Sequence, residues 1–246
     1  MAHGRLRIGT SGWEYEHWRG DFYPGDLPKD RWLEHYARTF ATVELNASFY
    51  RLPPRVTFER WARRVPDDFV FSAKASRYLT HLKRLREPDE PLERFWTRAT
   101  GLGSHLGPVL YQLPPRWKPN LERLAAFLAV VPPDRPQVVE IRDRRWYGPA
   151  LDELLEQAGV ALCLHDMAGS GTAGTVGLVG PFVYLRLHGS GARYGGRYPD
   201  AVLDEWAARL RGWTDAGRDA WVYFNNDVGG HAPRDALRLI ERASGR

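Results

Sequence analysis

Charged and apolar residues alternate in several short segments, and the charged residues are of the types that transfer protons or bind anions. In one such segment Tyr184, Arg186 and His188 alternate with three aliphatic residues. Because successive side chains of a β-strand point to opposite faces, the polar set shares one face and the apolar set the other. If the apolar face packs against helices, the polar face points to the opposite side of the sheet, which is the inward side of the fold.

Two further segments place carboxylates on the inward face. Glu44 and Asn46 share one face of an early segment, and Glu140 shares a face with Arg142 in a later one. We expect polar side chains of other segments to join them: Ser72, Lys74, Gln112 and Asn225.

Burial of a lone charge costs several kcal/mol, so Glu44 and Glu140 should be paired with Lys74, Arg142 or Arg186. Such pairs could serve the fold alone. A buried ion pair is often no more stabilising than an apolar replacement, so stability by itself explains a polar interior poorly. We therefore expect these charges to form one connected network in a functional pocket.

His188 is the residue that we expect to transfer protons, with Glu44 and Glu140 as the other candidate acids and bases. The ordinary pKa of a histidine lies near neutrality, which suits this role. The pattern predicts a hydrolase- or lyase-type enzyme for a small polar anionic substrate, a phosphorylated one included. No nucleotide-binding signal is present, so we expect no cofactor. His188 could instead be structural and hydrogen-bond the glycine-rich loop that follows it.

Glycine-rich loops follow the last two candidate strands. One runs from Gly189 to Gly196 and contains Arg193 and Tyr194, and the other contains Asn225, Asn226 and a glycine pair. Backbone N–H groups of such loops can bind a phosphate, and an arginine adds a charged contact. The glycines could equally serve only to turn the chain.

The pair His165-Asp166 suggests a metal ligand or a proton relay. Neighbouring strand residues point to opposite faces, so we expect only one of the two to face the pocket. No His-x-His or comparable cluster is present, and we expect no metal.

Aromatic residues are dense in the loop after the first candidate strand, which contains Trp13 and Trp18, and Tyr50 follows the second. These rings could stack on a ring or base of a ligand, or form a packed lid. The expected ligand contacts are therefore Trp13, Asn46, Tyr50, Lys74, Gln112, Arg142, Asp166, Arg186, Arg193, Tyr194, Asn225 and Asn226.

Short apolar runs alternate with amphipathic stretches throughout, which is typical of repeated βα units. The expected strands are Leu6–Thr10, Thr42–Asn46, Phe69–Lys74, Val109–Leu113, Val138–Arg142, Ala161–His165, Phe182–His188 and Ala220–Asn225. The expected helices lie within Leu33–Phe40, Leu92–Leu106, Leu121–Val131, Leu151–Ala158, Val202–Trp213 and Arg234–Arg242. The glycine-rich stretch Ala168–Thr175 suggests that the sixth helix is missing or replaced by a loop.

Eight strands in this order predict a (β/α)8 barrel of the TIM type, whose function lies at the carboxyl ends of the strands. The 246 residues suit a single domain over 1–246, without linker or internal repeat. A doubly wound open sheet is the alternative, but no Gly-x-Gly-x-x-Gly follows the first strand.

Composition excludes several other classes. Hydrophobic residues make up 43% and charged residues 26%, which excludes a disordered chain and a coiled coil. No apolar run is long enough to span a membrane and no signal peptide is visible, so we expect a cytoplasmic protein with no membrane partner. The single cysteine, Cys163, excludes an intramolecular disulfide and a cysteine-based metal cluster.

The formal net charge of +5 permits an anionic partner. One alternative to an enzyme is therefore a nucleic-acid-binding or -processing protein that uses basic loops and stacking by Trp13, Trp18 and Tyr194. A second alternative is a protein that binds a metabolite without turnover.

Four of these segments also carry a family resemblance: Ile8–Trp13, Val43–Tyr50, Tyr184–Gly189 and Tyr223–Asn226. In this order they resemble the domain-of-unknown-function family 72, also called the YecE-like family. The resemblance extends over essentially the whole chain and includes an Asn-x-Ser/Thr-Phe-Tyr pattern, present as Asn46, Ser48, Phe49 and Tyr50. It implies a TIM-type barrel and no established reaction.

Overall fold

The computed structural model describes residues 3–167, 169–172, 176–190 and 194–245, and within them eight parallel strands follow one another in a closed barrel. The predicted (β/α)8 fold is therefore confirmed, and the open-sheet alternative is wrong. The strands are β1 (Leu6–Ser11), β2 (Thr42–Leu45), β3 (Val70–Lys74), β4 (Leu106–Gln112), β5 (Gln137–Glu140), β6 (Ala161–His165), β7 (Val183–Leu187) and β8 (Ala220–Phe224).

Contacts group the chain into two compact units. Unit 1 comprises Met1–Glu44, Leu164–Ala173 and Phe182–Arg246, and unit 2 comprises Leu45–Cys163 and Gly174–Pro181. The single domain expected over 1–246 stays a prediction.

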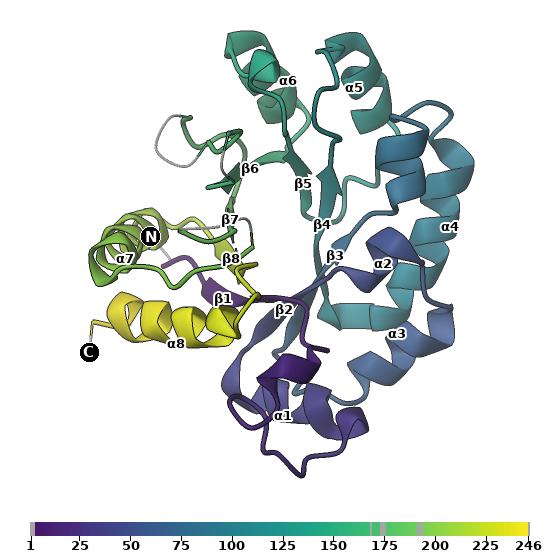
Figure 1. The fold of residues 1–246 in the computed structure, drawn as a ribbon. Helices are drawn as coiled ribbons and strands as arrows, with labels where there is room; N and C mark the ends of the chain where they lie inside the picture. The colour runs from purple at the N-terminus through teal and green to yellow at the C-terminus, as the bar shows by residue number, and fades with distance from the viewer. Residues whose placement is uncertain (1–2, 168, 173–175, 191–193, 246) are drawn as a thin grey trace. The chain divides into compact units, whose positions relative to one another are not determined.

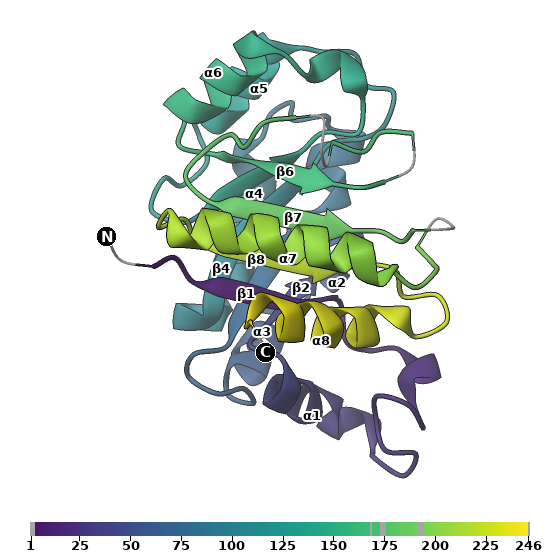
Figure 2. The ribbon, with the colours of Figure 1, turned by 90° about the vertical axis from the view of Figure 1, so that its left-hand side faces the viewer.

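Unit 1 is built on a parallel sheet in which β1 pairs with both β2 and β8, and β8 pairs with β7. Its α-helices are α1 (Trp32–Thr39), α7 (Asp200–Asp215) and α8 (His231–Ala243), with 3-10 turns η1 (Glu16–Trp18) and η2 (Lys29–Arg31) after β1. Figure 2 shows α7 and α8 lying side by side over β7, β8 and β1. Leu203, Trp206 and Leu210 are buried on α7 at three- and four-residue spacing, which gives the helix its packed face.

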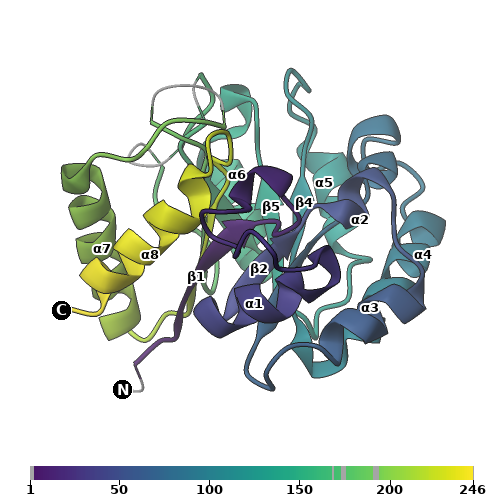
Figure 3. The ribbon, with the colours of Figure 1, turned by 60° about the horizontal axis from the view of Figure 1, so that its bottom comes forward.

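In unit 2, β4 pairs in parallel with β3 and β5, and β5 pairs in parallel with β6. Its α-helices are α2 (Ala47–Tyr50), α3 (Arg55–Ala62), α4 (Asp89–Ala99), α5 (Leu121–Leu128) and α6 (Pro149–Gln157), and its short turns are η3 (Tyr78–Leu82), η4 (Thr100–His105) and η5 (Arg144–Trp146). In Figure 1 α5 lies beside α6, and Figure 3 shows α3 beside α4.

Local chain geometry corrects several predicted boundaries. The helix expected over Leu92–Leu106 is broken at Gly103, whose φ of 58° an L residue rarely adopts. β2 ends at Leu45 and β8 at Phe224, so Asn46 and Asn225 do not lie on strands as predicted. Asn46 has helical backbone angles and begins α2, because the chain turns there.

The expected absence of a sixth helix after β6 agrees with the described part of that connection, residues 166–167, 169–172 and 176–182, which contains no helix. Residues 168 and 173–175 of the glycine-rich stretch lie outside the described residues. The helices α2 and α3 were not predicted. α2 is a single turn, too short to show a helical period.

Candidate functional site

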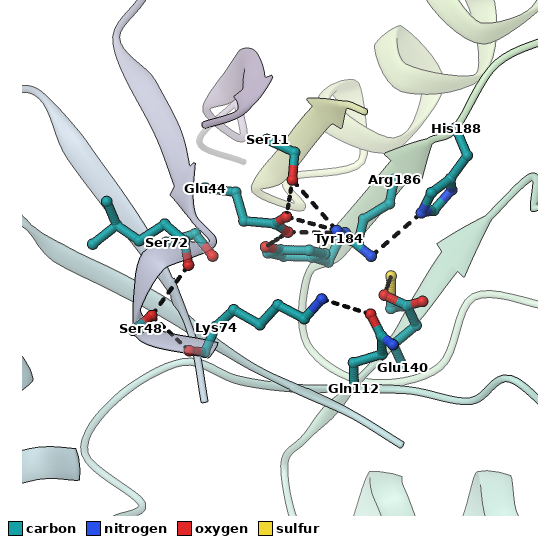
Figure 4. Close-up of polar contacts among 12 residues, drawn as sticks. Ser11, Glu44, Ser48, Ser72, Lys74, Gln112, Glu140, Tyr184, Arg186 and His188 are labelled. Carbon is teal, nitrogen blue, oxygen red and sulfur yellow. Dashed lines mark hydrogen bonds and ion pairs between the residues drawn. The ribbon is translucent and has the colours of Figure 1, made fainter. Parts of the chain in front are cut away.

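The Glu44 side chain, at the carboxyl end of β2, is fully buried and accepts four hydrogen bonds within unit 1. Arg186 donates from Nε to Oε2 at 2.9 Å and from Nη2 to Oε1 at 2.8 Å, as Figure 4 shows. The Tyr184 hydroxyl donates to Oε2 at 2.7 Å, and the Ser11 hydroxyl donates to Oε1. A carboxylate has about four lone-pair positions, so these donors saturate Glu44. The predicted pairing of Glu44 with Arg186 is confirmed.

His188 lies two residues beyond Arg186 and contacts its guanidinium. Arg186 Nη1 is 3.3 Å from His188 Nε2. A guanidinium can only donate, so Nε2 accepts and the imidazole proton lies on Nδ1. His188 Nδ1 is 3.4 Å from Asp166 Oδ1, a distance at which the carboxylate favours this tautomer.

Asp166 is itself held by two donors. Its Oδ1 accepts the backbone N–H of His188 at 2.6 Å, and its Oδ2 accepts the hydroxyl of Tyr198. Burial, and then the charge of Asp166, raise the pKa of Tyr198, so this hydroxyl keeps its proton and donates it. The same hydroxyl accepts the N–H of Gly189 at 2.7 Å and thereby ties the start of the glycine-rich loop to the Asp166–His188 pair.

His165 also faces His188, with ring centroids 6.0 Å apart. The prediction that only one of His165 and Asp166 faces the site is therefore wrong. β6 ends at His165, so strand alternation no longer separates it from the following residue. In the part of the chain that the structure describes, no group of three or more His, Cys, Asp or Glu side chains is placed to hold a metal ion.

The two glycine-rich loops contain the remaining unit 1 candidates. Arg193 lies outside the described residues. The Tyr194 ring lies 5.9 Å from the His188 ring between centroids. Asn226 is buried, and its Nδ2 donates to Gly196 O at 3.0 Å and to Asp235 Oδ2 at 2.8 Å, so it braces one loop against α8. Asn225 is half-buried.

The amino end of α8 does not favour the predicted phosphate site. Arg234 in the first turn of α8 forms an ion pair with Asp21. A Cβ atom at Gly230, the residue that caps α8, would lie 3.3 Å from Asp21 Oδ2. A carboxylate therefore already lies where a phosphate would approach the helix.

Unit 2 brings together the other predicted charges. Lys74 Nζ, at the end of β3, donates to Gln112 Oε1 at 2.7 Å and lies 4.2 Å from the centroid of the Phe49 ring. The predicted pair of Glu140 with Arg142 is confirmed as a buried ion pair, although β5 ends at Glu140. The network of charges expected to connect all these residues stays a prediction.

The sequence analysis missed His81, a half-buried residue of η3 whose ring lies 5.0 Å from the Phe49 ring between centroids. Burial, and then the positive charges of Lys74 and Arg77, lower the pKa of His81 to about 4. Its position in the loop after β3 was the available signal, because such loops carry the functional residues of this fold. Strand alternation predicts inward-facing residues only on strands, and His81 lies on none.

The aromatic residues after β1 pack against one another. Trp13 is 5% exposed and Trp18 is not exposed at all, and Trp18 Nε1 donates to Asp227 Oδ1 at 2.7 Å. Neither ring offers a face for stacking on a ligand. Tyr50 differs, since it is 80% exposed on α2.

A cavity of about 450 Å³ in unit 1 lies away from these residues. It is lined near the start of β1 by residues that include His3, Leu6, Arg211, Asp215 and Ile240. The amino ends of barrel strands contribute to stability rather than to catalysis, so we do not assign the site there.

A family model described as "Protein of unknown function DUF72" matches residues 7–246. The chain belongs to this family. The resemblance that the four motifs carry is therefore confirmed. The DUF72 chain is 27% identical over 270 residues to UPF0759 protein YunF of Bacillus subtilis, covering 96% of this chain and 94% of that one.

Further relatives agree with this assignment. UPF0759 protein YecE of Escherichia coli K12 is 34% identical over 140 residues, which cover 54% of this chain and 52% of YecE. The crystal structure of a DUF72 family protein, TM1631 of Thermotoga maritima, superposes with a TM-score of 0.86 at 25% identity and covers 98% of this chain and 99% of that one. None of these names states a reaction. No helix among the described residues of the DUF72 chain has the length and apolar character needed to cross a membrane.

Proposed function

We propose that this DUF72 chain is an enzyme of the hydrolase or lyase type that acts on a small polar anionic substrate, with His188 as the group that transfers a proton. The observation that carries the proposal is the series of contacts in unit 1 that links buried Glu44, Arg186 and His188 with half-buried Asp166. The Asp166 carboxylate faces Nδ1 of His188, and Nε2, which accepts from Arg186, is the atom that would exchange a proton with substrate.

Arg186 supplies the positive charge in this arrangement. Its guanidinium is 1% exposed and fixed at Nε and Nη2 by Glu44, while Nη1 is directed toward His188. A cation fixed in this way can stabilise negative charge that develops next to the imidazole. Hydrolysis and elimination both develop such charge and both need a proton transfer.

The contacts of the two glutamates support positioning roles for them. Glu44 is saturated by donors and holds Arg186, and Glu140 is paired with Arg142. The proton transfer that the sequence also allowed for Glu44 and Glu140 therefore falls to His188.

A purely structural role for the series is less well supported. A buried ion pair contributes little more than an apolar pair, and an apolar pair would need no oriented histidine. Stacking on nucleic acid finds no support at Trp13 and Trp18, because both rings are buried. A binding protein without turnover is an outcome of the experiment below.

The experiment screens phosphate esters and hydroxy- and amino-carboxylates for product release, and then compares variants on any substrate found. His188→Asn keeps the size and polarity of the side chain, and we expect it to lower kcat by about a hundredfold or more with little change in Tm. His3→Asn, at an exposed histidine of the same unit, is the matched control and should keep the wild-type kcat.

Two results would contradict the proposal. Turnover of His188→Asn at the wild-type rate would make the histidine structural. Saturable binding of the same compounds without product would identify a metabolite-binding protein.

A further inference from the structure

A second cluster of chemically active side chains lies in unit 2, around the Phe49 ring. The Lys74 ammonium lies 4.2 Å from the centroid of this ring, and the His81 ring packs edge-on against it at 5.0 Å. Gln112, at the end of the neighbouring strand β4, accepts a hydrogen bond from Lys74 at 2.7 Å. An ammonium and an imidazole thus share one aromatic platform at the carboxyl ends of β3 and β4.

The charges that face His81 come from two parts of unit 2. Lys74 ends β3, and Arg77 stands just before η3, the turn that contains His81. Glu140 and Arg142 come from the end of β5 and the residues after it, and they form an ion pair with each other. Of these four groups, three are cations and one is an anion. The electrostatic balance at His81 is therefore positive.

Burial and this positive balance together keep His81 neutral at neutral pH. Its pKa is lowered to about 4, first by burial and then by Lys74 and Arg77, against an opposing effect of Glu140. A neutral imidazole next to a buried ammonium can take up a proton once negative charge arrives.

We propose that Lys74, Gln112 and His81 form an oxyanion-binding site in unit 2, which holds a carboxylate or phosphoryl group at the Lys74 ammonium and takes up a proton on His81 when it is filled. The proton comes from the solvent, and no bond other than this N–H forms or breaks. The proposal goes beyond the reaction proposed at His188, since it rests on unit 2 residues alone and holds whether or not turnover occurs there.

Proton binding at His81 and anion binding at Lys74 should be thermodynamically linked. An anion bound at Lys74 adds negative charge beside His81 and raises its pKa above about 4. By reciprocity, protonation of His81 strengthens anion binding by the same factor, which is about tenfold for each pKa unit. Anion affinity should therefore rise as the pH falls through the pKa of His81.

The test follows the His81 ring by NMR in the full chain, with its signal assigned by His81→Gln. The pH titration is run in sodium chloride, in sodium sulfate and in sodium chloroacetate at equal ionic strength. Sulfate represents a phosphoryl group and chloroacetate a carboxylate, and both are still largely ionised at the expected midpoint near pH 4. We expect the pKa of His81 to rise by about one unit or more in at least one of the two oxyanions.

The oxyanion that raises the pKa of His81 indicates the chemical class of the ligand. A response to sulfate alone indicates a phosphoryl ligand, a response to chloroacetate alone indicates a carboxylate, and a response to both supports the shared oxyanion chemistry. An unchanged pKa in both, relative to chloride, would overturn the proposal.

Two variants separate the site from general screening. Lys74→Met should raise the pKa of His81 in chloride and abolish the response to the oxyanion, because the binding cation is gone. Arg77→Gln, at an exposed residue that also faces His81, should raise the pKa in chloride but keep the response. If Lys74→Met does not fold, Gln112→Leu should weaken the response in its place. A response that Lys74→Met or Gln112→Leu retains in full would also overturn the proposal.

Discussion

Replacement of Glu44 by glutamine is the most direct test of how the buried charges of unit 1 are held. Gln has nearly the same shape, so the substitution removes the negative charge that the Arg186 guanidinium faces and opens little space. It also turns an amide N–H₂ toward groups that are themselves donors, namely Tyr184, Ser11 or Arg186. Glu44→Gln should therefore destabilise the protein strongly.

The magnitude follows from burial and hydrogen bonding. Glu44 is 0% exposed and Arg186 is 1% exposed, so water does not screen the loss. Removal of one partner of a buried pair of this kind costs about 3–5 kcal/mol. A chain of this size loses about 2–4 °C in Tm for each kcal/mol, so we expect a decrease of roughly 6–20 °C.

The assay is urea and thermal unfolding of wild type, Glu44→Gln and two comparison variants. Glu59→Gln removes a partner of Arg55 in an exposed pair of unit 2 and should cost less than about 1 kcal/mol. The double variant Glu44→Gln with Arg186→Met should regain part of the stability, because no buried charge loses its partner. A Glu44→Gln midpoint within about 2 °C of the wild type would refute the buried ion pair as the element that holds this site.

Two further predictions follow from the same contacts. Because the pKa of His81 is lowered to about 4, the unfolded chain binds more protons than the folded chain between the ordinary pKa of histidine and about pH 4. The free energy of unfolding should therefore fall as the pH decreases through this window. His81→Gln should weaken this pH dependence in urea unfolding measured across the window. Tyr198→Phe removes the donor to Asp166 and the acceptor of the Gly189 N–H, and it should cost about 1–3 kcal/mol in urea unfolding. If the screen proposed above finds a substrate, Tyr198→Phe should also lower kcat on it, and an unchanged kcat would show that Asp166 does not need this hydroxyl to orient His188.

The alternation of apolar runs with amphipathic stretches predicted the fold, and the alternation of side chains along the strands predicted that both carboxylates are buried and paired with cations. A period of two places Glu44, Arg186 and Glu140 inside, and the cost of burying charge then requires partners for the carboxylates. Both inferences hold because the strands are regular where these residues stand. The pattern alone did not determine which cation pairs with Glu44, since that depends on which strands are neighbours in space.

The failures occur where strands end. Asn46 was expected to share a face with Glu44, but the chain turns into α2 at this residue. His165 and Asp166 were expected to point to opposite faces, but β6 ends between them and both approach His188. His81 belongs to a turn with no strand period at all. Functional residues of this fold lie at the carboxyl ends of strands, which is where periodicity stops being informative.

The two carboxylate–arginine pairs differ in what the fold must do to form them. Glu140 and Arg142 are two residues apart, so they remain neighbours even in the unfolded chain, and their pairing needs only local extended backbone. Glu44 and Arg186 are 142 positions apart, and they meet only because β1 lies between β2 and β8, and β8 pairs with β7. The fold brings the second pair together at the expense of chain entropy, and it does so with a bidentate geometry that leaves one guanidinium nitrogen directed at His188. The long-range pair, rather than the local one, therefore fixes Arg186 next to His188, the residue that we propose to transfer a proton.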